Sequence, residues 1–290
     1  MPDNAVGSIT TCEAGIGWLQ QAASAGASYS IMFNREEREE IRAALVRAAQ
    51  ADSNVTGAAH LGSAAADRLD DWSDIDFALC ISPNAAMDEV IALWTARLYE
   101  GHGAVAHCDV KRGNTLYRVF LLRNTLQVDL SFWAAGQFRA VGPEFKLILG
   151  TSNEGQPSPA DSTAELIGLA WLYGLHVRSS IARHRLLQAE YMLSNMRNRV
   201  IALACVREGF STSEGRGFDD LSKNQRSRFA ECYPSSLNPD ELQRAFQRTM
   251  SALLREIRLR DSDLAERIGP TLIEVAGRDA SPSWAAGNPD

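Results

Sequence analysis

The chain has 290 residues, of which 45% are hydrophobic and 22% are charged, and its formal net charge is −7. This is the composition of a globular protein long enough for two domains. No apolar run reaches the roughly 18 residues that span a bilayer. No basic segment precedes an apolar one at the N-terminus, so we expect neither a membrane partner nor a signal peptide. The acidic balance disfavours a nucleic-acid partner, because binding to the phosphate backbone relies on clustered Lys and Arg.

The five cysteines are scattered along the chain, and no C-x-x-C pair occurs among them. The five histidines show no spacing that is typical of metal ligands. This usage argues against a disulfide framework and against a structural zinc site. It predicts a reducing environment, and hence a cytoplasmic protein.

The first part of the chain is predicted to contain both helices and strands. A helix is expected over residues 35–50, because acids occupy its first turns and Ile41, Leu45 and Ala48 recur at helical spacing. A second helix is expected over 86–99, and strands are expected over 55–61, 74–82, 105–111, 116–122 and 126–133. We therefore predict an α+β domain over residues 31–150, built around a small mixed sheet.

A break in composition follows this domain. The segment GTSNEGQPSPADS, from Gly150 to Ser162, is rich in Gly, Pro and Ser, which is typical of a linker. Beyond it no strand is expected, and an all-helical bundle domain is predicted over residues 160–278. Its helices are expected over 164–183, 186–207, 223–233 and 239–258. The terminal segments 1–30 and 279–290 are predicted to be loosely ordered.

Two acids open one of the predicted strands, in the segment DIDFALCI. Alternate residues of a strand share a face, so Asp74 and Asp76 lie on one face. The apolar residues Ile75, Phe77, Leu79 and Ile81 form the other, which we expect to face the core. Two carboxylates roughly 7 Å apart along a strand can converge on one or two divalent cations.

Two further features accompany this pair of acids. Gly62 and Ser63 directly follow the strand 55–61, and a glycine before a small hydroxyl residue lets backbone N–H groups and an O–H approach a phosphate. A helix that began at Ser63 would add its dipole. Asp129 is predicted to lie on the polar face of the strand 126–133, and a neighbouring strand could bring it beside Asp74 and Asp76.

Each of these features alone has a simpler explanation. Most isolated D-x-D pairs are surface acids or turn formers, and a Gly-Ser pair is common. The occurrence of all three features in this order favours a functional site. Asp109 is the rival third acid, and because two basic residues follow it closely, we interpret it as solvent-facing or ion-paired.

The order Gly62-Ser63, Asp74-x-Asp76 and Asp129 resembles the signature of the nucleotidyltransferase superfamily that includes DNA polymerase beta. A small α+β domain followed by a helical one is similar to the plan of the antibiotic nucleotidyltransferases, the aminoglycoside and lincosamide adenylyltransferases. The resemblance implies an enzyme that transfers a nucleoside monophosphate to a hydroxyl group of a small molecule and releases pyrophosphate. The expected donor is ATP, and the acceptor is expected to be an antibiotic.

The resemblance also implies roles for individual residues. Asp74 and Asp76 would hold two Mg²⁺ ions. Asp129 would hold the ion that activates the acceptor hydroxyl, or would itself accept the proton. Gly62 and Ser63 would bind the β- and γ-phosphates of the nucleoside triphosphate.

Glu190 is a second candidate for the general base. It is flanked by leucines at helical spacing. Burying an acid among apolar side chains costs free energy unless the acid has a partner. Its helix resembles a segment of kanamycin-type nucleotidyltransferases that carries a glutamate base. The alternative is that Glu190 pairs with a nearby arginine. Arg183, Arg197 and Lys223 could contact the triphosphate, or form surface ion pairs.

Other functional classes stay open at this point. A toxin-like or tRNA-modifying nucleotidyltransferase, with a protein or RNA acceptor, would use the same motif. A scaffold without activity is disfavoured, because all three acids are present. The acidic first domain favours a cationic acceptor such as an aminoglycoside. Neither the acceptor nor the formation of a homodimer is decided by the sequence.

Overall fold

The computed structural model describes residues 32–140, 144–155 and 162–277. The segments 1–30 and 279–290, which the sequence predicts to be loosely ordered, lie outside the described residues. The protein divides into two compact units between Ser158 and Pro159. The hydrophobic core of each unit is built from that unit's own residues.

The first unit contains a six-stranded mixed sheet. Its strands are β1 (Val55–Leu61), β2 (Ile75–Ile81), β3 (Ala104–Arg112), β4 (Thr115–Leu122), β5 (Gln127–Ala134) and β6 (Phe145–Leu149), in the spatial order β3-β4-β5-β2-β1-β6. The central pair β2 and β5 is parallel, and the other four pairs are antiparallel. The parallel pair is possible because α4, β3 and β4 lie between its strands in the sequence.

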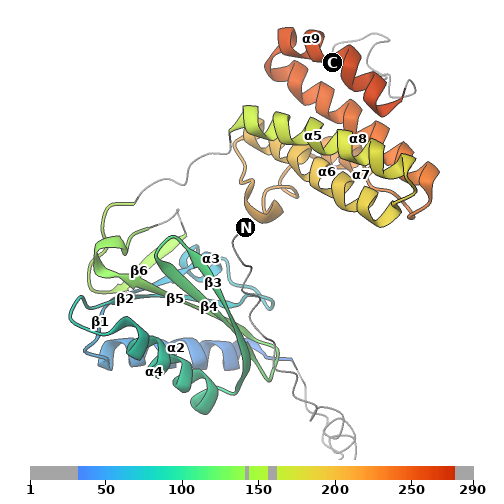
Figure 1. Ribbon diagram of the computed structural model, residues 1–290. Coiled ribbons are helices and arrows are strands. Elements are labelled where there is room, and N and C mark those ends of the chain that lie inside the picture. Colours follow the sequence, from blue (N-terminus) through green and yellow to red (C-terminus); the bar gives the residue numbers. More distant parts are fainter. Residues whose placement is uncertain (1–31, 141–143, 156–161, 278–290) are drawn as a thin grey trace, which may run out of the picture. The chain divides into compact units, whose positions relative to one another are not determined.

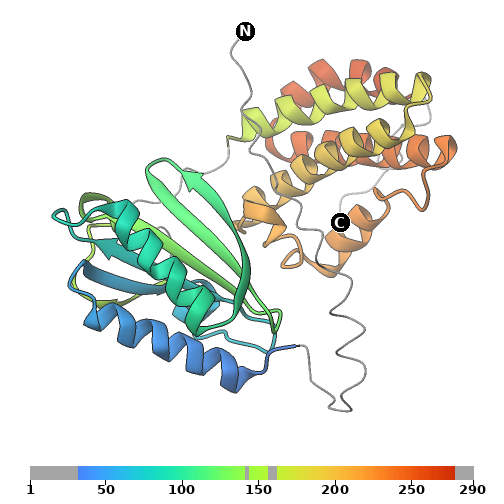
Figure 2. The same ribbon diagram turned by 60° about the horizontal axis from the view of Figure 1, so that its bottom comes forward.

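One face of this sheet is covered by α2 (Arg35–Ala51) and α4 (Met87–Gly101), as Figures 1 and 2 show. A capping box formed by Asn34 and Glu37 begins α2. The apolar residues of β2 pack beneath these helices, and they are almost fully buried: Ile75, Phe77, Leu79 and Ile81. This confirms the predicted core face of the segment and leaves its two acids on the opposite face.

The opposite face carries a smaller apolar cluster of Ala59, Ala78, Cys80, Trp133 and Phe138. The single helical turn α3 (Gly62–Ala65) contacts β1, β2 and β6. A 3₁₀ turn, η1 (Ala135–Gln137), follows β5. The limited cover on this face leaves the acids of β2 and β5 partly accessible.

The second unit is helical throughout its described residues. It consists of α5 (Thr163–Ala182), α6 (Leu186–Glu208), α7 (Lys223–Ala230), α8 (Pro239–Arg260) and α9 (Ser262–Ala276), with a 3₁₀ turn η2 (Ser213–Gly215). The long helices α5, α6 and α8 pack on one another (Figure 1), and α9 packs on α8 and α5. Asn238 caps α8, and Pro239 occupies its first turn.

The predicted fold class, an α+β sheet domain followed by a helical region, is confirmed. Apart from the 3₁₀ turns η1 and η2, two elements were not predicted, the edge strand β6 and the last helix α9. The predicted helix 223–233 ends earlier, at Ala230. No helix among the described residues is both long and apolar enough to cross a membrane. The cytoplasmic location stays a prediction.

We predict that residues 162–277, produced alone, form a folded helical domain. The main core cluster of this unit runs from Leu166 to Ala276 and uses no residue of the sheet unit. Far-UV circular dichroism should therefore show a cooperative thermal transition, and the fragment 32–155 should behave likewise. A helical but non-cooperative fragment that binds a hydrophobic dye would contradict the domain boundaries.

Candidate metal centre

The register of the central strands brings three carboxylates together. Asp76 of β2 lies directly opposite Asp129 of β5 in the parallel pair, and Asp74 stands immediately before β2. Each of the three acids offers an oxygen atom, and these oxygens all lie within 4.8 Å of one another. All three side chains are partly buried. The predicted acids of the motif thus form one cluster.

The electrostatics of this cluster suit a cation. Burial raises the pKa of Asp129 to about 6, an effect that the hydrogen bond from Gln127 opposes and the nearby charge of Asp74 increases. The side-chain amide of Gln127 bridges two acids, with its Nε2 at 3.0 Å from Asp129 Oδ1 and 3.3 Å from Asp74 Oδ2. Three hard oxygen ligands at this spacing are a donor set that fits Mg²⁺. A divalent ion would offset the repulsion among the carboxylates.

The Gly-Ser turn lies against this cluster. Gly62 has a positive φ of 58°, and a Cβ atom at this position would clash with Asp76 Oδ2. Glycine is therefore required both by the backbone conformation and by the carboxylate beside it. Ser63 follows in the one-turn helix α3, which is too short for the helix dipole considered from the sequence to contribute much.

Asp109 is excluded from the cluster by a partner of its own. Arg118 donates from Nε and Nη2 to the two oxygens of Asp109, each at 2.7 Å, and from Nη1 to Thr95 Oγ1 of α4. Arg118 lies opposite Leu130 in the sheet register, so this pair sits on the helix-covered face. The interpretation of Asp109 as an ion-paired residue is confirmed.

Glu190 of α6 lies in the helical unit and has an arginine partner. Arg197 Nη2 lies 3.4 Å from Glu190 Oε1. The guanidinium group also stacks on Tyr233, with Cζ 3.9 Å from the ring centroid, and it donates to the carbonyl oxygen of Cys232. Arg197 is buried, so the expectation that its ion pair lies at the surface is wrong, and a contact with a triphosphate stays a prediction. Pairing with an arginine, the alternative for Glu190, is observed.

The remaining two basic candidates are exposed. Arg183 follows the last residue of α5, and Lys223 begins α7. Neither forms an ion pair with another described residue. No surface ion pair of either residue is therefore observed within the described ranges, and a phosphate contact by either of them stays a prediction.

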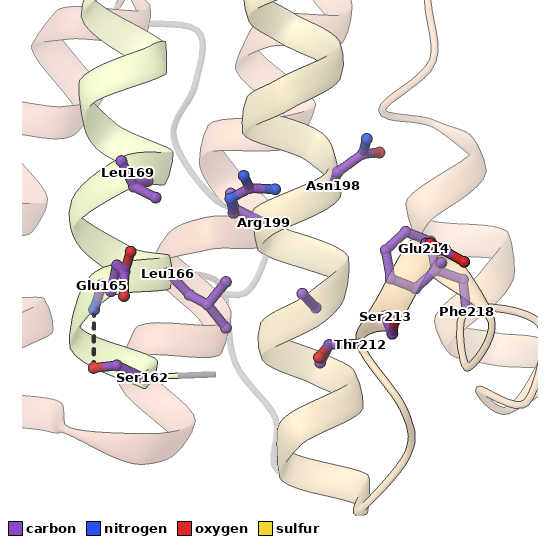
Figure 3. Close-up of a pocket in the computed structure, with 12 residues that line it drawn as sticks. Ser162, Glu165, Leu166, Leu169, Asn198, Arg199, Thr212, Ser213, Glu214 and Phe218 are labelled. Atoms are coloured by element: carbon purple, nitrogen blue, oxygen red, sulfur yellow. Dashed lines mark hydrogen bonds between the residues drawn. The ribbon is translucent and has the colours of Figure 1, made fainter. Parts of the chain in front are cut away.

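A pocket in the helical unit was not predicted from the sequence (Figure 3). Its volume is about 540 Å³, and it lies among the first turns of α5, the middle of α6 and the segment 212–218. The polar lining includes Glu165, Asn198, Arg199 and Thr212, while Leu166 and Phe218 supply apolar surface. None of the predicted site residues lines it. Its residues come from three separate elements, which no local sequence pattern connects.

Gln127 is the other side chain at the site that sequence reasoning did not single out. Its signal was present, because the alternation that places Asp129 on the polar face of β5 places Gln127 on the same face. The approach of Gly62 to Asp76 had no such signal, since it depends on how two strands pair.

Comparison with known proteins shows likeness to solved structures alone. No protein-family model matches the sequence, and no curated protein sequence matches it. Among solved structures, the chain is similar to an aminoglycoside 6-adenyltransferase from Bacillus subtilis, with a TM-score of 0.36 and 12% sequence identity. The similarity covers 83% of this chain and 98% of that chain. So distant a likeness does not define the activity of this chain.

We predict that Asp129→Asn stabilises the metal-free protein at pH 7 but not at pH 4. Folding raises the pKa of Asp129 from 3.8 to about 6. Between these values the folded state keeps a proton that the unfolded chain releases, so this residue's contribution to stability falls as pH rises. The shift in pKa corresponds to a change of at most about 3 kcal/mol in the free energy of unfolding. Screening by solvent reduces the stabilisation that we expect for Asp129→Asn at pH 7 to about 1 kcal/mol.

Thermal melts in EDTA between pH 4 and pH 8 test this prediction. Asp67→Asn, which removes one exposed acid of the same unit, is the control for a simple change of net charge. Mg²⁺ should raise the melting temperature of the parent more strongly at pH 8 than at pH 5. An effect of Asp129→Asn that is independent of pH would show that this carboxyl does not titrate in the expected range.

Proposed function

We propose that this protein is a Mg²⁺-dependent nucleotidyltransferase, which transfers a nucleoside monophosphate to a hydroxyl group of a small molecule. One observation carries the proposal: the oxygens of Asp74, Asp76 and Asp129 gather within 4.8 Å of one another. The turn at Gly62 lies directly against one of these acids. The proposed cation site and the proposed phosphate-binding turn are thus adjacent, as phosphoryl transfer requires.

In this proposal the acids would bind metal ions and the Gly62-Ser63 turn would bind phosphates. Asp74 and Asp76 would each bind the metal ions, and Asp129 would complete the site on the neighbouring strand. When bound, the ions neutralise the triphosphate and lower the pKa of the acceptor hydroxyl. The backbone at Gly62 and the hydroxyl of Ser63 would hold the β- and γ-phosphates. The chain would thereby supply positioning and charge neutralisation.

The reaction would be an in-line displacement at the α-phosphorus. The acceptor oxygen forms a bond to this phosphorus as the bond to the bridging oxygen of the β-phosphate breaks, and pyrophosphate leaves. The proton of the acceptor hydroxyl passes to Asp129 or to Glu190, the two candidate bases. We propose ATP as the donor and an antibiotic such as an aminoglycoside or lincosamide as the acceptor. A homodimer stays a prediction.

We predict that Asp76→Asn abolishes nucleotidyl transfer while the protein stays folded, because a neutral amide binds a divalent cation much more weakly than a carboxylate. Labelled ATP, GTP, CTP and UTP would be incubated with the protein, Mg²⁺ and a panel of hydroxylated antibiotics. Pyrophosphate release and product mass are the readouts. Asp109→Asn is the matched control, since it replaces the rival acid on the other face of the sheet.

Full nucleotidyl-transfer activity in Asp76→Asn would contradict the proposed mechanism. Loss of activity in both Asp76→Asn and Asp109→Asn would point to a general effect of removing acids from the sheet. Transfer to RNA or to a protein, with no transfer to any antibiotic, would replace the proposed acceptor and leave the catalytic mechanism in place.

Glu190 and Asp129 are separated as candidate bases by a second pair of variants. We predict that Glu190→Gln lowers kcat by roughly 10²–10⁴, the usual contribution of a general base, with little change in nucleotide affinity. Asp129→Asn should also weaken Mg²⁺-dependent nucleotide binding, because it removes a metal ligand. Calorimetry and steady-state kinetics measure these effects, with Glu266→Gln on the exposed face of α9 as the control.

A parent-like rate for Glu190→Gln would contradict the role of Glu190 as base. This residue would then be a partner of Arg197 only, and Asp129 would be the sole remaining candidate.

A further inference from the structure

Arg38 is a buried charge that the proposed reaction does not use directly. It lies in the run REEREE, residues 35–40, and it alone of these six charged side chains is buried, with 2% of its surface exposed. Spacings of three and seven residues place it on the same helix face as Ile41 and Leu45. An apolar side chain at this position would pack without the cost of desolvating a guanidinium group.

The guanidinium group of Arg38 holds a turn that leads into the metal site. Its Nη1 donates to the carbonyl oxygen of Asp70 and, at 3.1 Å, to that of Ser73. Its Nε donates to Glu39 Oε1 at 3.4 Å, and the Glu39 carboxylate is about half exposed. Arg38 therefore clamps both ends of the segment 70–73 from within the protein.

The clamped turn is also closed by its own hydrogen bonds. Ser73 Oγ accepts from the backbone N–H of Asp70 and donates to Asp70 Oδ1, each at 2.9 Å. Asp70 Oδ1 accepts in addition from the backbone N–H of Trp72 at 2.9 Å. The turn is thus a compact unit with defined ends, and Arg38 fixes it to α2.

The chain passes from this turn directly into the acids. Ser73 precedes Asp74, β2 begins at Ile75, and Asp76 is its second residue. A carbonyl held at Ser73 therefore determines where the backbone of Asp74 enters the cluster. Ligands of a metal site must be held within about 0.5 Å of their working geometry. A shift of the turn would move Asp74 relative to Asp129, which lies on a different strand.

We propose that Arg38 is a positioning residue for the carboxylate cluster: through the Asp70–Ser73 turn it sets the place of Asp74 and with it the affinity of the site for divalent cations. This inference rests on the proposed function, since it takes the cluster to be a metal site. The contribution of Arg38 is geometric, and it should appear in metal binding as well as in the rate of transfer.

The test uses Mn²⁺ as the probe and the full chain. The electron paramagnetic resonance signal of free Mn²⁺ gives the affinity of the parent, and Asp76→Asn shows whether the ion binds at the cluster. Arg38→Met keeps the length of the side chain and suits the apolar face of α2, but it lacks the donors. We expect it to bind Mn²⁺ about 10- to 100-fold more weakly, as is usual when the support of a metal ligand is lost.

Two further variants complete the comparison. Arg38→Lys keeps the charge but loses the planar fork, so it should restore part of the affinity. Arg42→Met is the matched control one turn further along α2, where the arginine pairs with Glu39. It should bind Mn²⁺ as the parent does. Circular dichroism at the temperature of the measurement establishes that each variant is folded.

Parent-like Mn²⁺ affinity in folded Arg38→Met would overturn the inference, even if the variant melted at a lower temperature. If Arg38→Met does not fold, Arg38→Lys decides: weaker binding supports the inference, and parent-like binding overturns it. If the parent does not bind Mn²⁺, or if Asp76→Asn binds it as tightly as the parent does, the proposed function fails and this inference fails with it. Weak binding by Asp76→Asn beside parent-like binding by Arg38→Met would refute the role of Arg38 alone.

Discussion

Carboxylates on Asp74, Asp76 and Asp129 repel one another, and the sheet nevertheless holds their oxygens within 4.8 Å. The buried residues on the other face of the same strands make this possible. Phe77 of β2 and Leu130 of β5 are opposite each other in the register and fully buried beneath the helices. A slip of one residue would bring apolar side chains to the open face and acids to the core. The hydrophobic core therefore enforces an arrangement that the acids alone would not adopt.

The groups around the cluster leave much of its negative charge uncompensated. Gln127 donates to two of the acids, which eases their repulsion only in part. Burial leaves Asp129 with a pKa of about 6, so it titrates close to neutral pH when no cation is bound. Gly62 brings the backbone against Asp76 and keeps the space beside that carboxylate free of a side chain. Clustered carboxylates and a close backbone approach thus occur at the same place.

The sequence was informative where a short-range pattern decides the structure. The two-residue alternation in β2 and β5 predicted the faces of Asp76 and Asp129. The ion pairing of Asp109 was also predicted, but its partner is Arg118 across the β3–β4 pair and not the basic residues that follow it. The pairing of β2 with β5 is non-local, so no local pattern could establish that the two acids lie directly opposite each other.

Other features were missed for definite physical reasons. The helix α9 contains Gly269-Pro270, a pair that usually ends a helix, but its Asp261 cap and its packing on α8 sustain it. The strand β6 lies at the edge of the sheet and pairs with β1 alone. It has only five residues, which is too short for an alternation of apolar and polar residues to be recognised. Arg38 stands in a run of charges that is typical of a solvated helix face, although it is buried. For Glu190 the sequence left two roles open, and the structure shows the ion pair with Arg197.

Whether the three carboxylates bind metal beside the triphosphate can be seen in a crystal structure of the protein with Mn²⁺ and a non-hydrolysable nucleoside triphosphate analogue, with data collected at the manganese absorption edge. We expect anomalous density among the oxygens of Asp74, Asp76 and Asp129, with the β- and γ-phosphates beside Gly62 and Ser63. Anomalous density elsewhere, or a triphosphate bound away from this turn with the three carboxylates free of metal, would contradict it.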